Sequence, residues 1–285
     1  MEKATGVLYI VATPIGNLED ITLRALRVLK ECDFIIAEDT RRSRQLLGHY
    51  AIHTRFDLSL YQGVEEARAE PIVEKLKAGA SIALISDAGT PLISDPGFVL
   101  VRRAVAENIR VVAIPGPTAL VTALIASGFP TDRFVFEGTP PKKPKARREY
   151  VERFRNETRT IIFYESLHRV LDTLELLAEL LGERSIALCR ELTKTYEEIL
   201  RGTPQEILQT LKAREAIKGE ITIVLAGASE TSQAASTEWS QLSVVEHLEQ
   251  LIAEGLDKRE AIKRVARLRG LRKQEVYDEA LRAQL

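Results

Sequence analysis

Residues 86–97 (SDAGTPLISDPG) combine acidic residues, glycines and prolines in a way that suits the binding of a small ligand. The Asp87 carboxylate could accept hydrogen bonds from such a ligand, and Gly89 would let the backbone come close to it. An ordinary turn is the alternative for this pair. Further along, Asp95 and Pro96 are typical of a helix start, with Asp95 as the N-cap and Pro96 as the first helical residue.

Two other loops rich in glycine and proline also follow apolar, strand-like runs. Residues 13–17 (TPIGN) come after the run GVLYIVA, and residues 115–119 (PGPTA) come after RVVAI. Ligands of open α/β sheets bind beyond the carboxyl ends of the strands, so several such loops at one sheet edge predict a ligand site. The loops contain neither GxGxxG nor the Walker A motif, the two commonest nucleotide fingerprints.

Charged side chains cluster after three other apolar runs, at residues 38–42 (EDTRR), 165–169 (ESLHR) and 190–194 (RELTK). Their position predicts charged loops at the carboxyl ends of strands. The first cluster has an alternative interpretation as a helix start, in which Asp39 or Thr40 is the cap and the arginines are solvated.

A basic stretch follows the first half of the chain. Residues 142–148 (KKPKARR) hold five cations in seven positions, with further prolines just before them. This pattern predicts a stiff, exposed basic loop that could bind phosphates. A loop that only adds solubility is the alternative.

The runs that position these loops are short, apolar and bounded by turn residues, which is typical of buried strands. Helical patterns alternate with them, so the sequence predicts an α/β fold. Residues 49–70 are polar and irregular, and we expect a loop or lid there. The expected strands lie at residues 6–12, 33–37, 82–85, 110–114, 133–137, 160–164, 185–189 and 220–226.

The chain divides into four parts. We expect one α/β domain over residues 1–119, a second over 120–228, a polar linker over 229–239 and a small helical domain over 240–285. Within that tail, the stretch from Lys258 to Lys273 holds eight cations against one acid. Three short helices with a glycine-containing turn resemble a helix-turn-helix. A small packing or dimerisation domain is the alternative.

The composition excludes several classes of protein. The 285 residues carry a net charge of −1, so any basic surface that binds a polyanion must be local. Cys32 and Cys189 stand in apolar surroundings without the spacing of a metal site, and we expect reduced core cysteines and no metal. The N-terminus lacks a signal-peptide pattern, and no apolar run approaches the roughly 18 residues of a membrane span. These features predict a soluble, cytoplasmic protein.

Six motifs, in their order and spacing, resemble the ribosomal RNA small-subunit methyltransferase I family, which belongs to the tetrapyrrole methylase superfamily. They are ATPIGNLEDIT, AEDTR, SDAGTPLISDPG, PGPTA, ESLHR and RELTK. The resemblance covers nearly the whole chain and implies two α/β domains with S-adenosylmethionine in a cleft between them, in a homodimer. The implied activity is 2′-O-methylation of a cytidine ribose in 16S ribosomal RNA. Leu167 stands where the family usually has proline, and residues 56–68 lack the family's loop with histidine and asparagine.

The resemblance also implies roles for individual residues. Gly-rich loops supply backbone donors and acceptors at close range, and an acid could accept from the cofactor's ammonium group or ribose. The residues expected to bind S-adenosylmethionine are Pro14, Gly16, Asp87, Gly89, Thr90, Thr118, Ala119 and Leu167.

Methyl transfer is an in-line displacement, so positioning should supply most of the catalysis. A ribose hydroxyl is a poor nucleophile, and a nearby base would add roughly a hundredfold or more. The candidates are Glu38, Asp39 and Glu165, with Lys194 as an electrostatic partner. We favour the first two because neighbouring arginines could hold a phosphate. The expected RNA contacts are Arg41, Arg42, Lys142, Lys143, Lys145, Arg147 and Arg148.

Two other functions fit parts of the sequence. A tetrapyrrole methyltransferase of the same fold would explain the loops, but a small-molecule enzyme needs neither the basic stretch nor the helical tail. A non-enzymatic RNA-binding assembly factor would explain the basic segments, but not the Gly- and Pro-rich loops that meet at strand ends.

Overall fold

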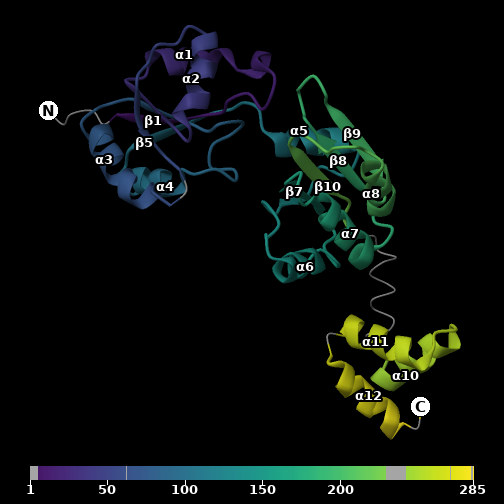
Figure 1. The fold of residues 1–285 in the computed structure, drawn as a ribbon. Coiled ribbons are helices and arrows are strands. Elements are labelled where there is room, and N and C mark those ends of the chain that lie inside the picture. The colour runs from purple at the N-terminus through teal and green to yellow at the C-terminus, as the bar shows by residue number, and fades with distance from the viewer. Residues whose placement is uncertain (1–5, 62, 229–241, 270, 284) are drawn as a thin grey trace. The chain divides into compact units, whose positions relative to one another are not determined.

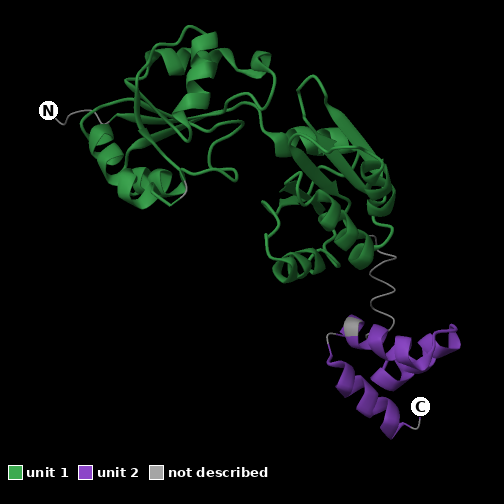
Figure 2. Cartoon of the chain, viewed as in Figure 1, with its two compact units in different colours: residues 1–227 green, residues 228–285 purple. Residues whose placement is uncertain are grey.

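The computed structural model describes residues 6–61, 63–228, 242–269, 271–283 and 285. The chain forms two compact units, residues 1–227 and 228–285 (Figure 2). The predicted linker, residues 229–239, lies outside the described residues, as do the first two residues of the predicted helical domain. The boundary expected at residue 119 falls within the first unit and stays a prediction.

A parallel five-stranded sheet forms the first half of unit 1 (Figure 1), with the strand order β3-β2-β4-β1-β5. The central strands are short and apolar, and β4 is buried at every position, as expected of a parallel strand covered on both faces. The strands are β1 (Val7–Val11), β2 (Phe34–Ala37), β3 (Phe56–Ser59), β4 (Ile82–Ile85) and β5 (Arg110–Ile114).

Four α-helices follow the strands of this sheet, each with an apolar face in its core. A short 3-10 helix, Leu18–Asp20, precedes the first of them. The helices are α1 (Leu23–Glu31), α2 (Thr40–His49), α3 (Glu65–Lys77) and α4 (Phe98–Ala106).

The prediction of a loop or lid over residues 49–70 is wrong in two places. Strand β3 forms at the edge of the sheet, and α3 begins at Glu65, six residues before the proline that suggested its start. Pro71 lies inside α3, where burial of Ala69, Ile72 and other apolar side chains stabilises the helix despite the missing backbone donor.

The prediction that Asp95 caps a helix is also wrong. Helix α4 begins at Phe98, and Gly97 is its N-cap with φ 130°, a conformation that favours glycine. The Gly97 N–H donates to the Glu65 carboxylate at 2.9 Å, so α3 supplies the acceptor for this helix start. Asp95 is therefore left free for another role.

The second half of unit 1 is a mixed five-stranded sheet with the order β6-β7-β10-β8-β9. Only β6 and β7 pair in parallel, and the other pairs are antiparallel. Helix α5 (Ala119–Ser127) packs against this second sheet. The strands are β6 (Phe134–Phe136), β7 (Thr160–Glu165), β8 (Ile186–Arg190), β9 (Glu198–Gly202) and β10 (Ile221–Leu225).

Three helices accompany this sheet: α6 (Pro144–Glu152), α7 (Val170–Leu181) and α8 (Pro204–Lys212). Thr203 and Glu206 form the predicted capping box at the start of α8. Cys32 and Cys189 are buried and free, as predicted. Burial raises the pKa of each thiol to about 11, so neither is a thiolate at neutral pH.

Unit 2 consists of α10 (Val244–Ala253), α11 (Lys258–Arg269) and α12 (Lys273–Arg282) around their own apolar core. Ser243 and Glu246 form the predicted capping box of α10. No helix among the described residues is long and apolar enough to cross a membrane.

Candidate active site

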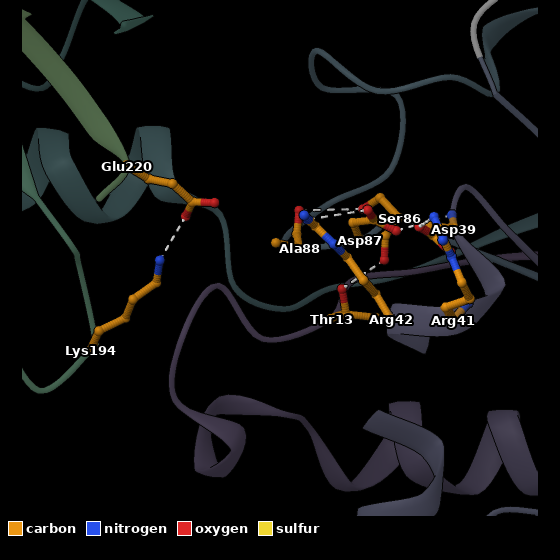
Figure 3. A network of polar contacts seen from close by, with 9 residues as sticks. All are labelled: Thr13, Asp39, Arg41, Arg42, Ser86, Asp87, Ala88, Lys194 and Glu220. Atoms are coloured by element: carbon orange, nitrogen blue, oxygen red, sulfur yellow. Dashed lines mark hydrogen bonds and ion pairs between the residues drawn. The ribbon is translucent and has the colours of Figure 1, made fainter. Parts of the chain in front are cut away.

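Strands β2 and β4 are parallel neighbours that pair Ala37 with Ile85, so the residues that follow them lie side by side. The backbone N–H of Asp39 donates to Asp87 Oδ1 at 3.1 Å, and Arg42 Nη1 lies 3.4 Å from Asp87 Oδ2. Figure 3 shows these contacts as one network with Thr13 and Ser86. Two separate sequence motifs, EDTRR and SDAGTP, therefore meet at one sheet edge.

Asp39 is a helix cap in this network. Its Oδ1 accepts from the Arg41 backbone N–H at 2.8 Å, and its carboxylate also pairs with the Arg41 guanidinium. These hydrogen bonds lower the pKa of Asp39 to about 2, which makes it a weak base. The helix-start interpretation of this cluster is thus confirmed for Asp39.

Glu38 has the opposite electrostatic environment. Burial, followed by the negative charges of Asp95 and Asp87, raises the pKa of Glu38 above its usual value. Burial and the charge of Asp87 likewise raise the pKa of Asp95 to about 6, and a hydrogen bond from Ser86 offsets part of that shift. Glu38 and Asp87 also line an open pocket of about 440 Å³ together with Arg41, Arg42 and Tyr61.

The loops after β1 and β4 are tied together by backbone. Thr13 and Gly89 form an isolated antiparallel bridge, with the Thr13 N–H donating to Gly89 O at 2.8 Å and the reverse bond at 3.0 Å. The buried Thr13 hydroxyl also lies within hydrogen-bond distance of Ser86 O. A Cβ at Gly89, where φ is 81°, would meet Ile15 at 3.2 Å, so this close approach requires glycine.

The loop after β5 joins the same edge, because β1 lies between β4 and β5 in the sheet. The Thr90 hydroxyl donates to Pro117 O at 3.0 Å, which holds the second and third loops together. The structure therefore brings together the predicted cofactor residues Pro14, Asp87, Gly89, Thr90, Thr118 and Ala119.

The first sheet's loops also contact the second half of unit 1. The Asn17 N–H donates to Thr193 Oγ1 at 3.1 Å, and a Cβ at Gly16 would lie 2.3 Å from Lys194 Cγ. Lys194 Nζ is paired with Glu191 at 2.8 Å and Glu220 at 3.0 Å, the second of which is drawn in Figure 3. Burial lowers the pKa of Lys194, but these two bonds outweigh burial and raise it. Lys194 is a positioned cation and a poor proton donor or acceptor.

Glu165 is a buried residue whose carboxylate bonds neighbouring residues of its own loop and of α7. Its side chain is fully buried, Oε2 accepts from the Thr173 hydroxyl at 2.5 Å, and Oε1 accepts from the Ser166 N–H at 2.6 Å. Arg169 lies 3.4 Å from the same carboxylate. These contacts fix the loop that carries the half-buried Leu167, and they leave Glu165 without access to a substrate hydroxyl.

The prediction of an exposed basic loop over residues 142–148 is wrong in its second half. Pro144 begins α6, so Arg147 and Arg148 lie on a helix. Arg147 is 4% exposed and pairs with Asp172 at 3.0 Å, and Arg148 pairs with Glu179. Proline is favoured in the first turn of a helix, and this signal was available in the sequence. Lys142, Lys143 and Lys145 are exposed.

Asp95 is the residue that sequence reasoning missed. It follows Asp87 by eight positions in a loop without periodicity, and its neighbour Pro96 gave a stronger signal for a helix start. Only the fold shows that the charge of Asp95 interacts with the charges of Glu38 and Asp87. Among the residues that the structure describes, no group of three or more acids, histidines or cysteines could hold a metal ion.

Comparison with known families gives a clear match. The sequence pattern of the Tetrapyrrole (Corrin/Porphyrin) Methylases matches residues 7–208. A protein named ribosomal RNA small subunit methyltransferase I from Halalkalibacterium halodurans is 49% identical over 274 residues, which is 96% of this chain and 94% of that protein. Proteins of the same name from Haemophilus influenzae and Escherichia coli O157:H7 are 49% and 45% identical, and each alignment covers at least 97% of both chains.

Two solved structures share the fold at low sequence identity. Diphthine synthase aligns with a TM-score of 0.58 and 14% identity, over 81% of this chain and 94% of that one. Uroporphyrin III C-methyl transferase from Thermus thermophilus aligns with a TM-score of 0.53 and 16% identity, over 77% of this chain and 97% of that one.

Proposed function

Since the chain belongs to the ribosomal RNA small subunit methyltransferase I family of the tetrapyrrole methylases, we propose that it methylates the 2′-oxygen of a cytidine in 16S ribosomal RNA, with S-adenosylmethionine as donor. The observation that carries the proposal is similarity over the whole chain: identity of 45–49% extends through the helical unit. A ribosomal RNA substrate also accords with action in the cytoplasm.

The residues at the sheet edge fit the proposed cofactor. S-adenosylmethionine carries two cations, an ammonium and a sulfonium, and the edge gathers the carboxylates of Glu38, Asp87 and Asp95. Burial first, and then repulsion among these acids, raise the pKa values of Glu38 and Asp95. A cationic ligand would relieve the repulsion. The three tied loops add backbone donors and acceptors for the ligand's neutral groups. Bound there, S-adenosylmethionine would supply an activated methyl group.

This chain's own contribution would be to orient the RNA and accept a proton. We assign the base to Glu38, whose carboxylate lines the open pocket and would take the proton from the ribose 2′-hydroxyl as the 2′-oxygen attacks. Its raised pKa, caused first by burial and then by the charges of Asp95 and Asp87, strengthens it as a base. Asp39 and Glu165 are held in structural hydrogen bonds, which argues against the same role for them.

RNA would reach this edge along cations that the fold leaves exposed. Arg41 and Arg42 flank Glu38, and their side chains are 86% and 71% exposed. Lys142, Lys143 and Lys145 are the remaining candidates of the basic stretch. Arg147 is buried and paired with Asp172, which argues against a direct phosphate contact from it. Arg148, paired with Glu179, is less exposed than Arg41 and Arg42.

We also propose that the protein is a homodimer. Val121 and Ile125 lie one turn apart on α5 and are 41% and 69% exposed, an apolar surface that a second copy could cover. Sedimentation at micromolar concentration should give twice the mass of the 31.8 kDa chain. A monomer under these conditions would contradict this proposal without affecting the reaction assigned above.

The function is tested by incubating the protein with methyl-tritiated S-adenosylmethionine and small ribosomal subunits that lack this modification. Label should enter the RNA, and protein and unmodified tetrapyrrole offered in parallel should stay unlabelled. Label in the tetrapyrrole alone would assign the chain to a small-molecule methyltransferase. Absence of cofactor binding together with tight RNA binding would instead indicate an assembly factor.

A further inference from the structure

The helical unit segregates its charges. From Lys258 to Lys273 there are eight cations and a single acid, Glu260. The other described acids of unit 2 lie on α10, between α10 and α11, and on α12. Solubility alone requires charges of both signs but no such separation, so this basic stretch points to an anionic partner.

The cations of α11 lie on its exposed side. Ala261, Ile262, Val265 and Ala266 are buried in the core of the unit. Arg259, Lys263 and Arg264 are exposed. Arg259 and Lys263 are four residues apart and so lie one turn from each other on the same side of the helix. Among the described residues, Lys263 pairs with Glu260, and no ion pair involves Arg259 or Arg264.

A groove runs beside these cations. It has a volume of about 570 Å³ and, besides Glu260, is lined by Leu256, Lys263, Arg264, Ala266, Leu271 and Lys273. Its lining includes three cations, Lys263, Arg264 and Lys273. Leu271 is 38% exposed, so the groove also offers apolar surface on which a sugar or base could pack. We name the exposed cations Arg259, Lys263 and Arg264 of α11, together with Lys273 from the first turn of α12, the α11 basic face.

We propose that the α11 basic face is a second RNA-binding surface, which binds the phosphate backbone of the ribosomal RNA outside the site of methyl transfer. The inference rests on the proposed function for the identity of the polyanion. Charge complementarity selects a nucleic acid, and the flexible side chains of lysine and arginine on a helix suit phosphates rather than a particular base. The overall net charge of −1 makes such a local surface necessary.

The test compares three full-length variants with the parent protein in binding to transcribed 16S ribosomal RNA. In the first, Arg259, Lys263, Arg264 and Lys273 are changed to Ala. In the matched control, four exposed cations of unit 1 that make no ion pair with a described residue are changed to Ala. These are Arg24, Lys30, Arg110 and Arg133. A third protein keeps the charge of the α11 basic face by exchanging each Lys for Arg and each Arg for Lys.

The α11 variant should bind the RNA about tenfold more weakly or worse. Its plot of log Kd against log salt should flatten by roughly 0.7 for each single-strand phosphate that the variant no longer binds. The matched control and the charge-preserving protein should keep the parent's affinity and slope. Calorimetry with S-adenosylmethionine should give one affinity for all of them, and circular dichroism verifies that unit 2 stays folded.

An α11 variant with the parent's affinity and salt slope would overturn the inference, as would an equal loss in the matched control. Failure of the proposed function has a different signature. In that case the parent itself would transfer no methyl group to ribosomal RNA, whatever the result for the α11 basic face.

Discussion

At the scale of single residues, we assign different roles to two adjacent acids, Glu38 and Asp39. Both line the pocket, but Asp39 is held by Arg41 as a helix cap with a lowered pKa, whereas the pKa of Glu38 is raised by burial and by nearby acids. Neutralising Glu38 with Glu38→Gln should therefore lower single-turnover methyl transfer by about a hundredfold or more, and it should weaken cofactor binding less than Asp87→Ala does. Asp39→Asn should keep most of the transfer rate but lower the melting temperature. Equal rates for parent and Glu38→Gln would contradict the assignment of the base.

Asp87 should act mainly on the cofactor. Asp87→Ala removes the acceptor for Asp39 N–H and Arg42 and a carboxylate for the ligand's ammonium, so cofactor binding should weaken by about 1.5–3 kcal/mol. Asp87→Asn keeps an acceptor for the Asp39 N–H and serves as the folding control, with the charge alone removed. Calorimetry that finds parental affinity in both folded variants would remove Asp87 from the site.

Asp95 should make stability depend on pH. Because burial and Asp87 raise the pKa of Asp95 from 3.8 to about 6, the folded state binds a proton more tightly than the unfolded state does. The contribution of Asp95 to the stability of the parent therefore falls as pH rises from about 4 to 6, by roughly 1–3 kcal/mol in all. Asp95→Asn should be more stable than the parent at pH 7.5 and nearly equal to it at pH 4.

Urea unfolding of the two proteins at both pH values checks this. A variant that is less stable than the parent at pH 7.5, or a difference that does not change with pH, would show that Asp95 carries no such penalty. Because the two proteins differ at one titratable group, the comparison cancels the contributions of the other acids.

At the scale of elements, helix α6 and the residues just before it carry a buried basic side chain, Arg147, and exposed lysines, and we expect different roles for them. Arg147 is buried, with Nε and Nη1 lacking an acceptor among the described residues, so Arg147→Ala should cost about 1–3 kcal/mol through poorer packing. Arg147→Met fills much of the same volume without burying unpaired donors, and we expect stability within about 1 kcal/mol of the parent. Denaturant midpoints measure both, and a parental midpoint for Arg147→Ala would show that the side chain contributes no packing.

In contrast to Arg147, the exposed lysines before and within the first turn of α6 should contribute to RNA binding and not to stability. Changing Lys142, Lys143 and Lys145 to Ala should leave the melting temperature unchanged, because all three are exposed. If they contact phosphates, RNA affinity should fall and its salt dependence should flatten. Filter binding across a salt series tests this, and an unaltered slope would mean that these lysines are only solvated.

The accuracy of strand prediction from sequence varied with the apolar signal of each segment. All eight predicted strands exist, because each is a short apolar run, including the edge strands β5 and β6 with their exposed positions. The two strands that were missed, β3 and β9, are edge strands with half-buried or exposed side chains, and their short sequences FDLS and EILRG carry little apolar signal. Their pairing is decided by the neighbouring strand, which a local pattern does not contain.

The same reasoning explains which parts of the candidate site were found. Three Gly- and Pro-rich loops were predicted to meet because each follows a strand of one parallel sheet, and the bonds from Thr13 to Gly89 and from Thr90 to Pro117 join them. The burial of Glu165 and Arg147 and the acidic surroundings of Asp95 depend on helices distant in sequence or on loop geometry. Residue type alone could not distinguish these anchors from ligand-binding groups.

At the scale of the whole molecule, a chain with a net charge of −1 places three carboxylates at one sheet edge, beside Arg41 and Arg42, and further exposed cations at the start of α6 and on α11. The acidic edge suits a cationic methyl donor, and the basic surfaces suit an RNA. A tetrapyrrole methyltransferase would require only the acidic edge, so the exposed cations distinguish the proposed enzyme from it. Because the net charge is only −1, overall composition gave no indication of these local cations or of a polyanionic substrate.

The central claim is that a methyl group reaches a ribose oxygen of one cytidine. Small ribosomal subunits from cells that lack this activity are treated with the parent or with Glu38→Gln and S-adenosylmethionine, and the RNA is digested to nucleosides for mass spectrometry. We expect 2′-O-methylcytidine to rise toward one equivalent per subunit with the parent and to form at least about a hundredfold more slowly with the variant. A methyl group on a base, on another nucleoside or on no RNA at all would contradict the account.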